Sequence, residues 1–99
     1  PNDVAAGQTL EQIGRSLAEC GRAAADAGVE IWMEVHGAGT SRPEHCRTIM
    51  EHCGHASVGL TWNCNPTDIK DGSVAAGFEM LWPWIKSCHI NELYRDAAG

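Results

Sequence analysis

Residues 29–36 read VEIWMEVH, a short apolar run that ends in polar side chains. The residues alternate in character. Ile31, Met33 and Val35 fall on one side of an extended strand, while Glu34 and His36 fall on the other. An apolar strand face must be buried against a second layer of structure. The stretch therefore predicts a β-strand that packs on helices and presents Glu34 and His36 on the opposite side.

Two later runs have the same character. Residues 57–63 read SVGLTWN, and residues 86–92 read KSCHINE. The alternation places Asn63 and His89 on the same side as Glu34. The apolar residues that alternate with them in each run are expected to face helices. Ligands bind at the C-terminal ends of strands in parallel α/β folds, so these three residues are candidates for a site.

A helical repeat of apolar residues precedes each run. The capping-box pattern TLEQ predicts a first helix that starts at Thr9, and Gly28 is expected to end it. The pattern SRPE predicts a second helix that starts at Ser41 and ends at Gly54. Pro83 should kink or end a third helix early. The predicted apolar stripes are Leu10, Ile13, Leu17, Cys20 and Ala24; Cys46, Ile49, Met50 and Cys53; and Val74, Phe78, Leu81, Trp82 and Ile85.

The fold class predicted from this order is α/β, with three parallel strands alternating with three helices. The third strand is expected around residues 87–91. Three parallel strands leave two open edges and an uncovered polar face. We therefore expect residues 1–99 to form one partial-barrel unit, a fragment of a larger barrel. A second protomer that completes the sheet is the alternative.

Composition restricts the function. The net charge of −6 argues against nucleic acid or an anionic membrane as a partner. Five cysteines without a CxxC pair indicate reduced thiols in a cytoplasmic protein. A zinc site is disfavoured near residues 45–55, because Cys46 and Cys53 lie on the apolar stripe whereas His45 and His52 lie off it.

The strand-end motifs MEVHG (33–37), VGLTWN (58–63) and CHINE (88–92) resemble a known superfamily. This is the xylose isomerase-like TIM-barrel superfamily, specifically its sugar phosphate isomerase/epimerase group. The motifs look like that group's E-x-H-G, V-G-L-x-W-D and H-x-H-x-K-D-type strand ends, in the order of its fifth to seventh strands. The likeness covers residues 9–95 and implies a partial TIM (β/α) barrel.

The resemblance implies a divalent metal, Mn²⁺, Zn²⁺, Co²⁺ or Mg²⁺, at the barrel mouth. Its ligands would be Glu34, Asn63 and His89, and Glu34 would also be the catalytic base. Asn63 stands where the family has Asp, and a neutral amide is a poorer ligand for a hard cation than a carboxylate. The family's last carboxylate ligand belongs to an eighth strand that this chain lacks.

The resemblance also implies a sugar or sugar phosphate as substrate. Glu92 and Arg95 follow His89 with the H-x-x-E-x-x-R spacing of some epimerases. The residues expected to bind substrate are His36, Asn65, Asn91, Glu92 and Arg95.

The predicted reaction is proton transfer next to a carbonyl, an isomerisation or epimerisation that requires the full barrel. The remainder of the barrel or a second protomer is the expected protein partner. A non-catalytic binding or assembly module derived from the barrel is the alternative, because Asn63 replaces a carboxylate and one ligand is missing. Apurinic-site nuclease activity is a third hypothesis, and the negative charge counts against it.

Overall fold

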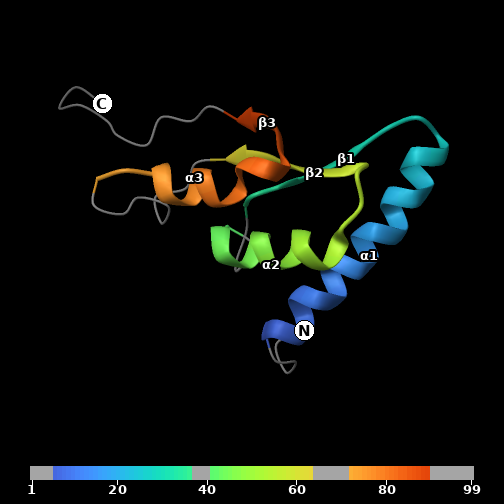
Figure 1. Ribbon diagram of the computed structural model, residues 1–99, viewed down its shortest axis with the longest axis horizontal. Helices are drawn as coiled ribbons and strands as arrows, with labels where there is room; N and C mark the ends of the chain where they lie inside the picture. The colour runs from blue at the N-terminus through green and yellow to red at the C-terminus, as the bar shows by residue number, and fades with distance from the viewer. Residues whose placement is uncertain (1–5, 37–40, 64–71, 90–99) are drawn as a thin grey trace.

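The computed structural model describes residues 6–36, 41–63 and 72–89 (Figure 1). The elements, in chain order, are α1 (Ala6–Asp26), β1 (Ile31–Glu34), α2 (Pro43–Cys53), β2 (Val58–Asn63), α3 (Ala75–Leu81), the 3₁₀ helix η2 (Trp82–Trp84) and β3 (Ile85–His89). The predicted alternation of three helices with three strands is confirmed. No helix in this described part has both the length and the apolar character needed to cross a bilayer.

The three strands form one parallel sheet in the order β1-β2-β3. Figure 1 shows α1, α2 and α3 on one side of this sheet. We call the opposite side the open face, because none of the described helices covers it. It carries Trp32, Glu34, Gly59, Thr61, Asn63, Lys86, Ser87 and His89.

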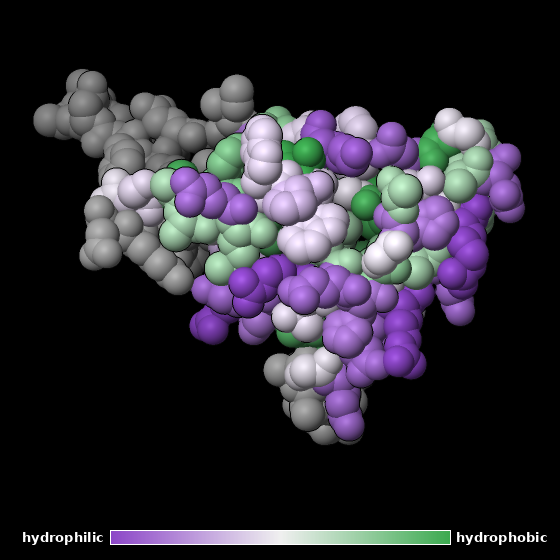
Figure 2. Space-filling model, viewed as in Figure 1, coloured by the Kyte–Doolittle hydropathy of each residue, from purple (hydrophilic) through white to green (hydrophobic). Residues whose placement is uncertain are grey.

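The core lies between the sheet and the helices. It consists of Val35, Cys46, Met50, Cys53, Val58, Leu60, Trp62 and Leu81. Trp62 meets Phe78 edge to face, with ring centroids 5.4 Å apart, and so ties β2 to α3. Figure 2 shows hydrophilic residues over the outer sides of α1 and α2, where the helical layer meets solvent.

The predicted alternation is confirmed for β1 and β2. Ile31 and Met33 pack against the core, whereas Trp32 and Glu34 are exposed. Asn91, expected in the third strand, lies outside the described residues. Cys88 is exposed, so the prediction that it packs against helices is wrong. It pairs with Trp62 in register, and β3 is an edge strand of the described sheet.

A β-bulge shifts the start of β3. The pairing jumps from Leu60–Ile85 to Thr61–Ser87, so one extra residue is inserted on β3. Ile85 therefore faces the core and starts a strand, rather than extending the third helix as predicted. Pro83 lies in η2 directly after α3, so the prediction that it ends this helix early is confirmed.

The helix starts differ from those predicted. Helix α1 begins at Ala6, so Thr9 lies inside the helix and its buried hydroxyl has no hydrogen-bond partner. At α2 the N-cap position is occupied by Arg42 without a side-chain cap, and Pro43 follows it. The predicted capping boxes therefore do not form. The predicted cap at Gly54 is confirmed, because this residue has φ 57° and donates its N–H to the Met50 carbonyl.

Helix α1 packs on α2 and β2 through two glycines as well as through part of its predicted apolar stripe, of which Leu17 packs against the core and Ala24 is buried. A Cβ at Gly14 would lie 2.5 Å from the Ile49 carbonyl oxygen, and one at Gly21 would lie 2.7 Å from Cγ2 of Val58. Only a residue without a side chain permits this approach. Cys20, which the stripe placed in the core, is exposed.

This close approach predicts the effect of one added methyl group. Gly14→Ala should lower the free energy of unfolding by about 1–3 kcal/mol, because backbone atoms of α2 must move. Gly7→Ala is the matched control: nothing lies within 4 Å of a Cβ there. It should raise stability by about 0.5–1 kcal/mol, since Ala favours helix. Urea denaturation measures both, and equal stabilisation by the two substitutions would contradict the packing.

Candidate functional site

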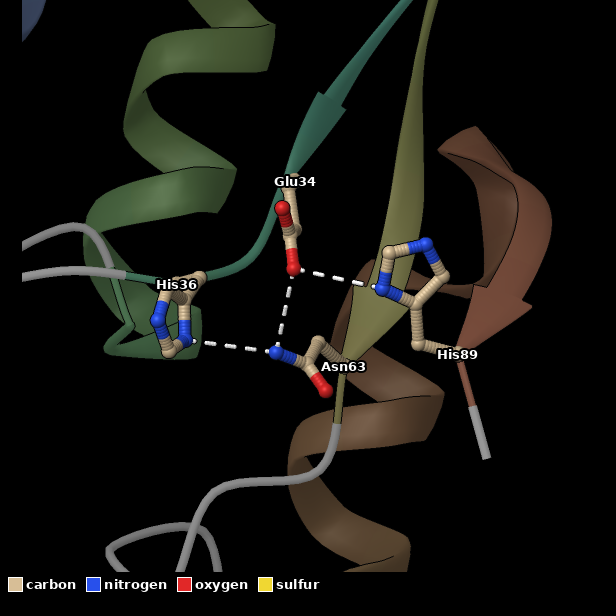
Figure 3. A network of polar contacts seen from close by, with 4 residues as sticks. All are labelled: Glu34, His36, Asn63 and His89. Atoms are coloured by element: carbon tan, nitrogen blue, oxygen red, sulfur yellow. Dashed lines mark hydrogen bonds and ion pairs between the residues drawn. The ribbon is translucent and has the colours of Figure 1, made fainter. Parts of the chain in front are cut away.

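Four polar side chains meet where the three strands end (Figure 3). Glu34 is the last residue of β1, Asn63 the last of β2 and His89 the last of β3. His36 follows β1 by two residues. All four are predicted as site residues from the sequence, and the structure brings them together.

One carboxylate oxygen links three of these groups. Oε1 of Glu34 accepts a hydrogen bond from Nδ2 of Asn63 at 3.2 Å. The same oxygen lies 3.2 Å from Nδ1 of His89. Nδ2 of Asn63 also lies 3.2 Å from Nδ1 of His36. The amide of Asn63 therefore stands between the carboxylate and one imidazole, while the other imidazole contacts the carboxylate directly.

The sheet register accounts for this convergence. Asn63 is paired with His89, and Glu34 is paired with Thr61. The N–H of Val35 donates to the Thr61 carbonyl at 3.0 Å, which carries the ladder one residue past β1. The N–H of His36 then donates back to the Glu34 carbonyl at 2.9 Å. This three-residue turn brings the His36 ring beside Asn63.

Burial differs sharply across the network. Asn63 is 6% exposed, whereas the side chains of Glu34 and His89 are 44% and 55% exposed. A buried amide needs its hydrogen bonds, because no water replaces a lost one. An exposed carboxylate–imidazole pair stabilises the fold little. The network thus has a buried centre and a periphery that a ligand from solvent can reach.

The spacing of Glu34 and His89 suits a metal ion in part. Two ligand atoms about 2.1 Å from one ion lie about 3.0–3.4 Å apart at octahedral to tetrahedral angles. The observed separation of 3.2 Å falls in this range. Asn63 instead turns its amide nitrogen toward Glu34 and its oxygen away (Figure 3). Within residues 6–36, 41–63 and 72–89, no group of three His, Cys, Asp or Glu side chains could hold a metal.

Of the other predicted substrate-binding residues, Asn65, Asn91, Glu92 and Arg95 lie outside the described residues. Lys86 also faces the open face, where its Cγ would lie 2.5 Å from a Cβ at Gly59, four residues before Asn63 and so away from the strand ends. Simple alternation from His89 places Lys86 toward the helices. The β-bulge reverses its side, and no signal in the sequence marks that bulge.

The prediction that the apolar stripe of the second helix, with Cys46 and Cys53, faces the core is confirmed. Cys46 and Cys53 are buried in the core. Nδ1 of His55 accepts a hydrogen bond from the backbone N–H of Ser57 at 3.1 Å.

Comparison of the chain with protein-family models, with curated proteins and with solved structures finds no match. The family resemblance of the strand-end motifs therefore stays a prediction. The contacts among Glu34, His36, Asn63 and His89 are the direct evidence for a site.

The burial contrast predicts unequal costs of substitution. Asn63→Ala should lower the free energy of unfolding by about 1–2 kcal/mol, because it removes a buried donor group. His89→Ala should cost about 0.5 kcal/mol or less, because its contact is exposed. Urea denaturation of the two variants provides the measurement. A larger loss for His89→Ala would show that the exposed contact, not the amide, stabilises the strand ends.

Proposed function

We propose that the chain supplies three consecutive strand–helix units of a xylose isomerase-like TIM barrel that acts as a metal-dependent sugar or sugar phosphate isomerase or epimerase. The observation that carries the proposal is the 3.2 Å contact between Glu34 and His89 on the open face. A carboxylate from one strand and an imidazole from another are the two kinds of metal ligand that the resemblance implies. Had they lain on opposite faces, the proposal would have failed.

The strand order supports the barrel. It runs in one direction, β1-β2-β3, with the helices on one side. Right-handed crossovers that continue in one direction wind a sheet toward closure. Doubly wound folds reverse direction and place helices on both faces. The open face then corresponds to the barrel interior, and the polar strand ends correspond to its mouth.

In this proposal Glu34 and His89 hold the ion and Glu34 also takes the substrate proton. A bound divalent ion would polarise the substrate carbonyl and so acidify the adjacent C–H. A carboxylate has two oxygens, so one can serve as a ligand while the other accepts a proton. Asn63 orients this carboxylate through its hydrogen bond. His36 adds an imidazole at the same strand ends.

The test uses the natural gene product that contains this sequence. Titration with Mn²⁺ followed by calorimetry should show a site that Glu34→Gln weakens about tenfold or more, because a charged ligand is lost. Glu30→Gln is the matched control. Glu30 is an exposed carboxylate that accepts from Nε1 of Trp32 at 3.1 Å and takes no part in the network. It should leave Mn²⁺ affinity unchanged.

Catalysis is measured in deuterated water with Mn²⁺ and a panel of ketoses. Proton transfer next to the carbonyl should incorporate deuterium at that carbon, detected by mass spectrometry. Glu34→Gln should abolish incorporation, and Glu30→Gln should not. Equal Mn²⁺ affinity and equal exchange in wild type and Glu34→Gln would contradict the proposal.

A second candidate function is a non-catalytic binding or assembly module derived from the barrel. It is favoured by the orientation of Asn63, which presents a nitrogen rather than a ligand oxygen to Glu34. The same titration separates the two candidates. Absence of a metal site in the natural gene product, together with absence of exchange, would favour the module.

A further inference from the structure

We propose that Asn63 is a positioning residue: the Glu34 carboxylate orients its amide, and the amide sets which ring nitrogen of His36 is protonated. The inference rests on the proposed function only in that it assigns roles within the same site. It departs from the ligand role that the resemblance gives to Asn63. One carboxylate holds two histidines in opposite tautomers: His36 is protonated at Nε2, and His89 is protonated at Nδ1.

The charge of Glu34 fixes the orientation of the Asn63 amide. An ionised carboxylate only accepts hydrogen bonds, so the Asn63 atom 3.2 Å from Oε1 of Glu34 must be a donor. That atom is Nδ2. A reversed amide would set Oδ1 against the carboxylate, two acceptors in contact. Asn63 is 6% exposed, so water could not relieve this repulsion.

The amide in turn fixes the tautomer of His36. The same Nδ2 lies 3.2 Å from Nδ1 of His36. An amide nitrogen carries two hydrogens and accepts nothing. One hydrogen serves Glu34, and the other is directed to His36. Nδ1 of His36 must therefore be an unprotonated acceptor, and the neutral ring carries its proton at Nε2.

His89 contacts Glu34 directly. Its Nδ1 lies 3.2 Å from Oε1 of Glu34. An unprotonated Nδ1 would set a lone pair against the ionised carboxylate, so Nδ1 carries the proton and the lone pair of the neutral ring lies at Nε2. Because Glu34 acts on His89 directly and on His36 through an amide, the two rings adopt opposite tautomers.

This assignment has a chemical consequence for substrate. Nε2–H of His36 can donate to a carbonyl or hydroxyl oxygen but cannot accept a proton from it. A neutral ring in this tautomer is a donor, and not a base, at Nε2. In the metal-free protein the lone pair of the neutral His89 ring lies at Nε2; an ion held between Nδ1 of His89 and Glu34 would replace the Nδ1 proton. An aspartate at position 63 would reverse the first assignment: a proton shared with Glu34 relieves the repulsion of the two carboxylates, and the oxygen beside His36 then accepts from Nδ1–H.

The experiment measures tautomers directly in ¹⁵N-labelled protein, with metal removed by a chelator and at about pH 8, where histidine is neutral. Long-range ¹H–¹⁵N correlation spectra distinguish Nε2–H from Nδ1–H rings. The resonances of His36 and His89 are assigned from their loss in His36→Gln and His89→Gln. The wild type should show Nε2–H for His36 and Nδ1–H for His89.

In the wild type, the tautomer of His89 tests the proposal more strictly than that of His36, because free histidine favours Nε2–H. This measurement needs no variant other than those used to assign the resonances. Asn63→Asp should convert His36 to Nδ1–H and leave the Nδ1–H form of His89 in place. Asn63→Ala should leave His36 in averaged tautomers. Glu34→Gln should release His89 toward Nε2–H. Backbone amide spectra confirm that each variant is folded.

Nε2–H at His89 in the wild type would overturn the proposal, as would an unchanged His36 tautomer in folded Asn63→Asp. Neither measurement uses metal or substrate. A protein without metal affinity or exchange activity can still show the two tautomers, and an active isomerase can still lack them. The two proposals therefore fail separately.

Discussion

The described helices α1, α2 and α3 pack on the same side of the sheet, and the candidate site depends on that arrangement. It forces the apolar residues of β1 and β2 to one side and leaves the alternate residues on the open face. Because the strands are parallel, their carboxyl ends meet at one edge. Glu34, Asn63 and His89 are then neighbours without any special loop. A change of direction in the strand order would have placed a helix over this face.

The site combines rigidity at its centre with access at its margin. Every residue of β2 is buried, and Asn63 at its end is held between two partners. Glu34 and His89 lie on the strands that flank β2, and both reach solvent. Such a layout fixes the polar side chains of the candidate site by packing rather than by loops. The glycine contacts of α1 with α2 and β2 stabilise the helical layer that supports this sheet.

Much of the fold follows from the sequence, for identifiable reasons. The alternation in VEIWMEVH and SVGLTWN predicts the sides of β1 and β2 correctly, because burial on one side leaves no freedom of register. Gly54 and Pro83 end their helices as predicted, since each acts through its own backbone. The packing roles of Gly14 and Gly21 were not predictable, because a glycine contact depends on how closely another element approaches. The predicted capping boxes are wrong because α1 begins before Thr9 and Arg42 takes the cap of α2.

The site was predictable to a similar degree. Strand-end position predicts the convergence of Glu34, Asn63 and His89, and the contacts confirm it. The orientation of the Asn63 amide was not predictable, because it is set by the charge of a side chain 29 residues away. The side of Lys86 was not predictable either, because the bulge that reverses it is a property of the sheet.

The proposed metal site is tested most directly by a crystal structure of the natural gene product grown with Mn²⁺, with data collected where manganese scatters anomalously. We expect an anomalous peak about 2.0–2.3 Å from a carboxylate oxygen of Glu34 and a ring nitrogen of His89, with Nδ2 of Asn63 still directed at the carboxylate. A peak elsewhere, for example between His45 and His52, would contradict the proposed site. So would a structure that holds Glu34 and His89 on opposite faces of the sheet.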